Sequence, residues 1–337
     1  MKDADTITLR LAYRPPLAWD ELLAFLAPRT IQGVECIENG TYLRTISIGG
    51  RHGWVSVARP PGEDALIATV PSYFSSLLRP ILSRLRGLFD LDADPATISA
   101  HFVADSLLGE LVIRTPGLRV PGAWDGFELA VRAILGQQVS VKGASTLAGR
   151  LAARFGSAVE TPHPALTLIG ADASSLAAAS VEDIARIGLP RSRAASIQSL
   201  AKVVCEGTLT LCPHGDALAA MAALKTVPGI GDWTAQYVAL RALRWRDAFP
   251  AGDLGLRKAV GEGTPVSGRT LSERSEAWRP WRAYAAMYLW RSPGGEKTNV
   301  RIEALYENRK PHRRTASDRG CARPHRTIHE REGENSG

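Results

Sequence analysis

The stretch LKTVPGIGDWTAQYVALRALRWRDAFPAGD, residues 224–253, holds residue types and spacings that could carry chemistry. At its centre is Pro228-Gly229-Ile230-Gly231, between two segments with apolar residues at helical spacing. Glycine permits a left-handed backbone, and a helix start leaves backbone N–H groups without partners. This corner could therefore bind an anion, and a duplex phosphate is the usual one. The alternative is a simple tight turn between two helices. A Gly-x-Gly motif taken by itself favours that turn over an anion site.

Two features downstream change that balance. Thr234-Ala235 follows the second glycine, and Phe249-Pro250-x-x-Asp253 ends the stretch. Together these motifs resemble the helix-hairpin-helix DNA glycosylases, in which an Asp follows a Gly- and Pro-bearing loop. The resemblance implies that Asp253 is the catalytic carboxylate at the mouth of a base pocket, although it could also cap the helix that follows. It further implies that four hairpin residues grip a DNA phosphate: Gly229, Ile230, Gly231 and Thr234.

One position of the hairpin separates two branches of this family. Bifunctional members, which also cut the DNA backbone, carry a Schiff-base lysine directly before the threonine, where this chain has Trp233. An indole cannot form an imine with a sugar aldehyde, so the lyase reaction lacks its nucleophile. Trp233, with Tyr237 four residues later, resembles the alkylpurine branch, the AlkA type of 3-methyladenine DNA glycosylase II.

The stretch WRPWRAYAAMYLW, residues 278–290, resembles the last helix of the same family. The resemblance implies that Trp290 lines the base pocket together with Trp233 and Tyr237. Aromatic residues at helical spacing usually belong to a core, so the remaining ones are expected to hold this helix to the hairpin domain: Trp278, Trp281 and Tyr284.

A Gly-Gln-Gln-Val-Ser segment, residues 136–140, resembles the family's loop that enters the minor groove. The resemblance implies DNA contacts by Gln137, Gln138 and Ser140. A wedge side chain of this loop fills the gap left by an extruded nucleotide, and in the alkylpurine branch it is often Leu. Gln138 stands at that position, and an amide unstacks bases less effectively than an apolar wedge. The identity of the wedge stays open, and the two glutamines could instead cap a break between helices.

The whole chain predicts an α+β fold. Residues 1–88 alternate as short strands with a helix at 19–26 and another at 72–88 that Pro80 kinks or splits. We expect a small, mixed and mostly antiparallel α/β domain that serves as a scaffold without chemistry. Residues 89–292 read as an all-α helix-hairpin-helix glycosylase domain, opened by caps such as Asp94 and by a capping box at Asp125 and Glu128. Residues 293–337 are expected to form a basic, disordered tail.

Composition adds weaker expectations. The formal net charge is +7, and residues 309–337 contribute eight Lys or Arg and four Asp or Glu, so charge alone would not predict DNA binding. The four cysteines are scattered, no apolar run approaches a membrane span, and the start MKDADTITLR does not resemble a signal peptide. We therefore expect a cytoplasmic monomer without a membrane partner, acting on the DNA of a bacterial nucleoid. No zinc spacing or nucleotide loop appears.

The expected reaction is hydrolytic excision of an alkylated, cationic base such as 3-methyladenine from double-stranded DNA. Breaking an N-glycosidic bond develops positive charge on the sugar, which a carboxylate such as Asp253 stabilises directly or while orienting water. A cationic base leaves readily and stacks well on aromatic faces. No cofactor is expected, and a monovalent metal ion at the hairpin carbonyls is left open. Two alternatives remain: a non-catalytic damage-sensing protein, and a glycosylase-lyase for oxidised bases.

Overall fold

The computed structural model describes residues 5–213 and 215–292. The chain divides after Val300 into two units, and every described residue belongs to the first. The tail predicted for residues 293–337 lies outside the described residues.

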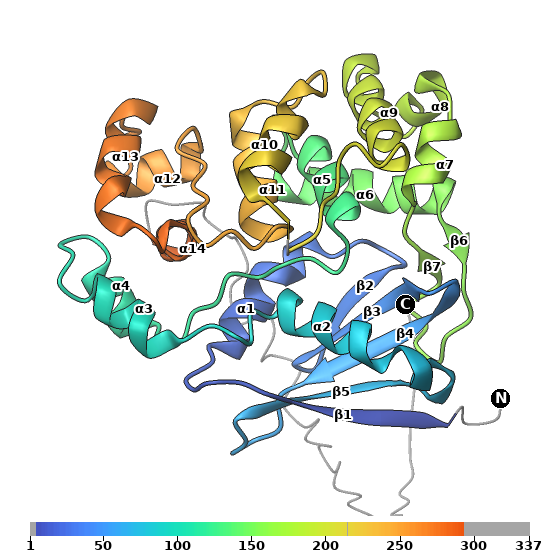
Figure 1. Ribbon diagram of the computed structural model, residues 1–337, viewed down its shortest axis with the longest axis horizontal. Coiled ribbons are helices and arrows are strands. Elements are labelled where there is room, and N and C mark those ends of the chain that lie inside the picture. Colours follow the sequence, from blue (N-terminus) through green and yellow to red (C-terminus); the bar gives the residue numbers. More distant parts are fainter. Residues whose placement is uncertain (1–4, 214, 293–337) are drawn as a thin grey trace, which may run out of the picture. The chain divides into compact units, whose positions relative to one another are not determined.

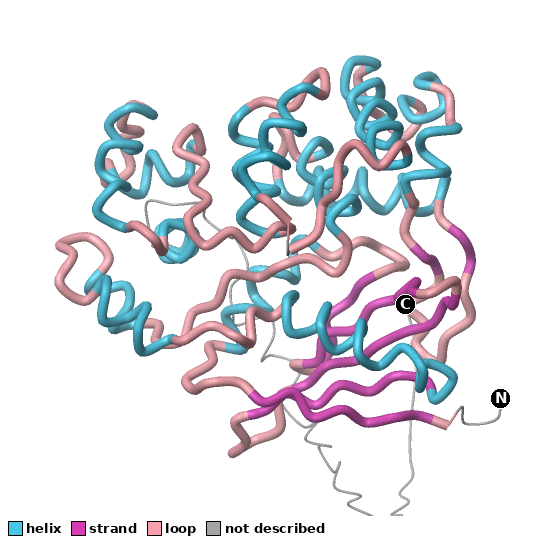
Figure 2. The backbone as a smooth tube through the Cα atoms, in the orientation of Figure 1, coloured by secondary structure: helices cyan, strands magenta, loops and turns pink. Residues whose placement is uncertain are grey.

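The strands are β1 (Thr6–Ala12), β2 (Glu35–Glu38), β3 (Thr41–Ile48), β4 (Arg51–Ala58), β5 (Ala65–Pro71), β6 (Ser157–Ala158) and β7 (Leu168–Ile169). The α-helices are α1 (Trp19–Leu26), α2 (Leu78–Leu88), α3 (Pro95–Phe102), α4 (Gly109–Arg114), α5 (Gly126–Leu135), α6 (Val141–Phe155), α7 (Ala173–Ala178), α8 (Val181–Ala185), α9 (Arg191–Cys205), α10 (Ala217–Thr226), α11 (Asp232–Arg241), α12 (Leu254–Val260), α13 (Gly268–Ser275) and α14 (Arg282–Arg291). Short 3-10 turns are η1 (Ala27–Arg29), η2 (Ser72–Leu77) and η3 (Glu276–Trp278). Strands β1–β5 gather at one end of the unit with α1 and α2 beside them, and most of the other helices lie at the opposite end (Figures 1 and 2), which confirms the α+β prediction.

The N-terminal sheet has the strand order β1-β5-β4-β3-β2, and all of its pairings are antiparallel. Asn39 and Gly40 both have positive φ in the turn between β2 and β3, as a two-residue hairpin requires. One face of the sheet packs against α1 and α2 through a continuous apolar core. The opposite face contributes Leu43 and Trp54, which are covered by Leu166 just before β7. The predicted small antiparallel domain is therefore confirmed, with both of its faces engaged.

The helix predicted at 72–88 is divided, but not at the proline. A 3-10 turn, η2, ends at Leu77, and α2 begins at Leu78. Pro80 then lies within the first turn of α2, where its missing N–H would have no intrahelical partner in any case. The break therefore falls just before the proline, in a place where proline costs little.

The C-terminal aromatic residues are fixed within the helical part by buried polar contacts. Trp278 is fully buried, and its indole Nε1 donates to Asp105 at 3.0 Å. The Tyr284 hydroxyl donates to Asp90 at 2.6 Å. The prediction that these side chains belong to the core is confirmed. Their polar partners precede α3 and α4, however, and do not lie in the hairpin.

Arg44 of β3 joins the sheet to the helical part. Its guanidinium is buried and donates to Glu35 at 3.2 Å and to Glu128 of α5 at 3.1 Å. Burial alone would lower the pKa of Arg44, but Glu128 and the other nearby acidic groups outweigh it and raise that pKa. The predicted capping box is therefore only half formed. Asp125 accepts from the Glu128 N–H at 2.9 Å, whereas the Glu128 carboxylate binds Arg44.

We predict that Arg44→Met destabilises the protein by about 3–5 kcal/mol, because it leaves two partly buried carboxylates, Glu35 and Glu128, without their buried cation. The matched control is Arg10→Met, which removes an exposed pair with Glu63 and should cost at most about 1 kcal/mol. Unfolding by guanidinium chloride at neutral pH measures the free energy of unfolding of both variants. Similar losses in the two variants would contradict the role of Arg44 in joining the sheet to α5.

Candidate active site and hairpin

The predicted hairpin is formed by α10, a five-residue turn and α11. Asp216 caps α10 by accepting from the backbone N–H groups of Leu218 and Ala219. Gly229 has a φ of +84°, and a Cβ there would lie 2.2 Å from the Ser196 hydroxyl on α9. Glycine is therefore required at this position by both conformation and space.

Gly231 differs from Gly229 in both respects. Its φ is −92°, which any residue can adopt, and a Cβ there would have no atom within 4 Å. Gly231 is the N-cap of α11 and makes no side-chain cap, so the first N–H groups of α11 are left to other partners. The absence of a side chain keeps the approach to this helix start open, as an anion site needs.

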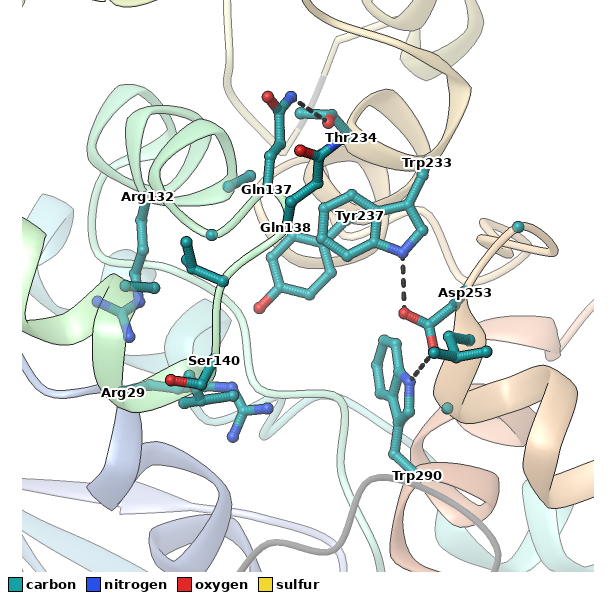
Figure 3. A pocket seen from close by; sticks show the side chains of 18 of the residues that line it. Arg29, Arg132, Gln137, Gln138, Ser140, Trp233, Thr234, Tyr237, Asp253 and Trp290 are labelled. Atoms are coloured by element: carbon teal, nitrogen blue, oxygen red, sulfur yellow. Dashed lines mark hydrogen bonds between the residues drawn. The ribbon is translucent and has the colours of Figure 1, made fainter. Parts of the chain in front are cut away.

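The side chains of Ile230 and Thr234 face inward. Ile230 is 5% exposed and packs in the main core, and its N–H donates to Val227 at 3.1 Å. Thr234 is 2% exposed. Gln137 donates through its side-chain amide to Thr234 Oγ1 at 3.1 Å and to the Gly229 carbonyl at 2.9 Å (Figure 3). The DNA contacts predicted for these residues stay predictions, and the geometry gives their side chains the additional task of joining the loop to the hairpin.

The loop between α5 and α6 presents three consecutive exposed residues. Gln138 has a left-handed backbone with a φ of +57°. Ser140 caps α6 by accepting from the Gly143 N–H at 3.1 Å. Between them, the apolar side chain of Val139 is 39% exposed. The resemblance placed Gln138 at the wedge position, left the identity of the wedge open, and did not point to this apolar neighbour.

Asp253 accepts hydrogen bonds from three N–H groups. Oδ2 accepts from the Trp233 indole at 2.8 Å, and Oδ1 accepts from the Trp290 indole at 3.0 Å and from the Leu256 N–H at 3.0 Å (Figure 3). The last of these bonds makes Asp253 the N-cap of α12. The N-cap that the sequence allowed for Asp253 is therefore confirmed, and its catalytic role stays a prediction.

The aromatic residues predicted for the base pocket come together around this carboxylate. The Trp233 and Tyr237 rings stack with centroids 5.3 Å apart and planes within 10°. Tyr237 meets Trp290 edge-on at 6.3 Å. Phe25 of α1 stacks on Trp290 at 6.5 Å, and the Arg29 guanidinium lies 3.9 Å from the Phe25 ring centre. Phe25 and Arg29 also line the cavity, which the sequence did not indicate, and the expectation of an N-terminal scaffold without chemistry stays a prediction.

These residues surround a cavity of about 1300 Å³. Its lining joins α1, the loop before α6, the hairpin and α12, and Asp253 is the one carboxylate among the described residues that line it. Three cationic side chains also line it: Arg29, Arg132 and Lys258. Nothing in the sequence spacing brings Arg29 and Arg132 near Asp253, so only the fold could reveal this charge.

Tyr237 lies where these charges converge. Burial alone would raise its pKa, but Arg241, Arg29 and Arg132 outweigh burial and lower it. The Arg241 Nη1 donates to the Tyr237 hydroxyl at 3.0 Å. The cavity therefore has an acidic and aromatic side at Asp253 and a guanidinium side beyond Tyr237, which Figure 3 shows opposite each other.

Among residues 5–213 and 215–292, no group of three or more His, Cys, Asp or Glu is placed to hold a metal ion. None of the helices described for this chain is long and apolar enough to cross a membrane.

The fold resembles that of the helix-hairpin-helix DNA glycosylases. The chain resembles the solved 3-methyladenine DNA-glycosylase from Archaeoglobus fulgidus with a TM-score of 0.73 and 26% identity, covering 84% of this chain and 97% of that one. The family model of the AlkA N-terminal domain matches residues 8–125. The model of the HhH-GPD superfamily base excision DNA repair proteins matches residues 131–282.

Sequence similarity narrows this class to one family. The chain is 34% identical over 291 residues to DNA-3-methyladenine glycosylase 2 of Escherichia coli, covering 84% of this chain and 97% of that protein. The chain belongs to the AlkA family of the HhH-GPD superfamily. It is also 38% identical over 288 residues to the "Probable bifunctional transcriptional activator/DNA repair enzyme AlkA" of Mycobacterium tuberculosis. That match covers 85% of this chain and only 57% of the relative's length.

We predict that Gly231→Ala leaves the fold intact but weakens DNA binding. The new methyl group would meet open space within the protein and would obstruct a phosphate at the start of α11. Loss of a charge-assisted hydrogen bond of about 1.5–3 kcal/mol raises the dissociation constant about ten- to a hundredfold. Fluorescence anisotropy with a duplex measures the affinity.

The control for this variant is Gly268→Ala at the start of α13. The added atom also makes no close contact there, and Gly268 does not line the cavity around Asp253. Equal affinities for Gly231→Ala and the wild type, with unchanged thermal unfolding, would argue against phosphate binding at the hairpin.

Proposed function

We propose that this protein is a monofunctional DNA glycosylase that extrudes an alkylated base from double-stranded DNA and removes it by hydrolysis. One observation carries the proposal: a single carboxylate, Asp253, is held by two indole N–H groups at the edge of an aromatic cavity. The family of the chain supports DNA as the substrate. The name of the Escherichia coli relative supports 3-methyladenine as the base that is excised.

The reaction follows from the position of the carboxylate. As the bond between C1′ and the base nitrogen breaks, its electron pair leaves with the base and positive charge develops on the sugar. The Asp253 carboxylate offsets that charge, while its bonds to Trp233 and Trp290 fix its orientation. A water molecule then adds to C1′ and loses one proton. A cationic base departs as a neutral molecule, so it needs no proton from the protein.

The aromatic walls suit a cationic base. Trp233 and Tyr237 present a stacked pair, and Trp290 closes the pocket against them. Attraction between a cation and such faces contributes about 0.5–2 kcal/mol for each contact. A neutral, undamaged base gains less from the same walls, so these contacts favour alkylated bases that carry positive charge.

A lyase reaction is disfavoured by the same geometry. The residue at the position of the lyase lysine is Trp233, whose ring nitrogen is bonded to Asp253. Among the described lining residues, Lys258 of α12 is the one that carries an amine. Borohydride reduction in the presence of damaged DNA tests both positions at once, and we expect no covalent protein–DNA product.

We predict that Asp253→Asn lowers base excision by about a hundredfold or more while DNA binding persists, because the neutral amide cannot offset charge on the sugar. Asn is also a good N-cap, so α12 should keep its start. Release of 3-methyladenine from methylated duplex DNA measures excision, and anisotropy measures binding.

Asp216→Asn is the matched control, since Asp216 caps α10 in the same manner and lies outside the cavity. Binding without release by the wild-type protein would favour the non-catalytic alternative. Release by Asp253→Asn at the wild-type rate would remove Asp253 from the mechanism.

Besides Gln138, the neighbouring residue Val139 is a candidate for the wedge. Val139 is the apolar and exposed side chain of the loop, and an apolar group fills a gap between bases better than an amide does. We propose that Val139 fills the gap left by the extruded nucleotide, while Gln138 hydrogen-bonds base edges.

On this basis Val139→Ala should slow single-turnover excision about tenfold, equivalent to ~1.4 kcal/mol. Gln138→Ala should have a smaller effect. Ile113→Ala, at an exposed apolar residue of α4 outside the cavity, serves as the control. A larger loss in Gln138→Ala than in Val139→Ala would return the wedge to Gln138.

Three further expectations stay proposals: a monovalent metal ion at the hairpin, a monomer in solution and a cytoplasmic location. Carbonyl oxygens have two lone pairs, and those of Val227 and Gly231 each accept one backbone hydrogen bond, so either could also bind a monovalent metal ion at the hairpin. Replacing K⁺ by choline at constant ionic strength would then weaken DNA binding. A monomer in solution and a cytoplasmic location are the other two, to be checked by sedimentation and by cell fractionation.

A further inference from the structure

The end of α14 meets α1 through two adjacent contacts. Glu21 and Phe25 stand four residues apart on α1 and therefore share one face of it. Trp290 and Arg291 are consecutive in the last turn of α14. Phe25 stacks on Trp290 with ring centroids 6.5 Å apart, and Glu21 forms an ion pair with Arg291. One apolar contact and one ionic contact thus join these two helices.

The ion pair is sheltered from solvent where its atoms meet. The Glu21 and Arg291 side chains are 25% and 30% exposed, but the Glu21 Oε2 that faces the guanidinium is inaccessible to water. Solvent screens such a pair less than one at an open surface. Arg291 also carries its charge at the C-terminal end of α14, where the helix dipole favours a cation. Within the described part of the chain, each of the two side chains has its only ion pair with the other.

Trp290 needs support of this kind because it is the penultimate residue of α14. Its indole donates to Asp253 Oδ1 at 3.0 Å (Figure 3). Helix ends are among the parts of a protein that open most readily. If nothing held the last turn of α14, the indole would leave the carboxylate part of the time, and a small displacement of a reacting group lowers the rate strongly.

We propose that Glu21 is a positioning residue of the proposed glycosylase. Its ion pair with Arg291 fixes the last turn of α14, and Trp290 in that turn fixes the orientation of Asp253. Neither Glu21 nor Arg291 lines the cavity, so neither meets the base or the sugar. The proposal rests on the proposed function and adds to it a charge on α1 that acts on the carboxylate through α14.

The Trp290 indole N–H can be observed by NMR in the full-length, ¹⁵N-labelled protein without DNA. Its resonance is the one that Trp290→Phe removes from those of the eight tryptophans. Glu21→Gln should speed hydrogen exchange of this N–H at least about tenfold, because the last turn of α14 opens more often. The Trp278 indole, which is fully buried and bonded to Asp105, should exchange as in the wild type.

Single-turnover release of 3-methyladenine from methylated duplex DNA measures the effect on the reaction. Glu21→Gln should slow release about tenfold and change the dissociation constant for undamaged duplex by less than about twofold. Asp20→Asn is the matched control, since it removes the same charge from the same turn of α1 at an exposed position. It should leave the release rate, the affinity and the exchange of the Trp290 N–H unchanged.

Two further experiments separate positioning from a loss of structure. Combining Glu21→Arg with Arg291→Glu restores the pair and should recover most of the rate that either change alone removes. Trp290→Phe keeps an aromatic wall and removes the indole N–H, so Glu21→Gln should cause no further slowing in that background. Thermal unfolding of each variant identifies loss of structure, and Arg291→Gln breaks the same pair from α14 if Glu21→Gln does not fold.

The other role open to Arg291 is contact with a phosphate of the DNA backbone. In that case Arg291→Gln would weaken binding of undamaged duplex and reduce its salt dependence, which would overturn the proposal. Unchanged exchange of the Trp290 N–H in Glu21→Gln would overturn it as well, and so would equal slowing of excision by Glu21→Gln with and without Trp290→Phe. Failure of the wild-type protein to release any base would instead refute the glycosylase function itself, and the exchange rates would still show whether Glu21 holds Trp290.

Discussion

The site depends on one carboxylate with three donors. Asp253 accepts hydrogen bonds from the Trp233 indole, the Trp290 indole and the Leu256 N–H in the first turn of α12. These three donors lie in three separate helices. Each bond fixes a wall of the cavity as well as the carboxylate. The same contacts that would hold Asp253 beside a sugar therefore also position the aromatic rings that would enclose the base.

Local patterns predicted much of this arrangement. Glycine and proline spacing predicted the hairpin between α10 and α11, because this feature depends on backbone conformation over a few residues. The resemblance placed Trp233, Tyr237 and Trp290 in one pocket, and the structure brings them together. Their roles with DNA remain predictions, since no nucleic acid is part of the structure.

What sequence reasoning missed depends on contacts between distant segments. The Glu128 carboxylate follows the sequence rule for a capping box but binds Arg44, because a buried guanidinium offers a stronger partner than a backbone N–H. Arg132 carried no sequence signal of a pocket residue, because an arginine within an apolar helix pattern indicates only an exposed face. The resemblance pointed to Gln138 as the wedge position and left the wedge open, and a sequence pattern could not show that Val139 is exposed.

Phe25 and Arg29 belong to the segment around α1, yet they form part of the wall that faces Trp290. The cavity is thus shared between one part that carries Asp253 and the hairpin and another part supplied from near the N-terminus. Changes around Arg29 would alter one wall of the cavity without touching the carboxylate or the hairpin. In the proposed glycosylase, the choice of base could therefore change while the reacting carboxylate stays the same.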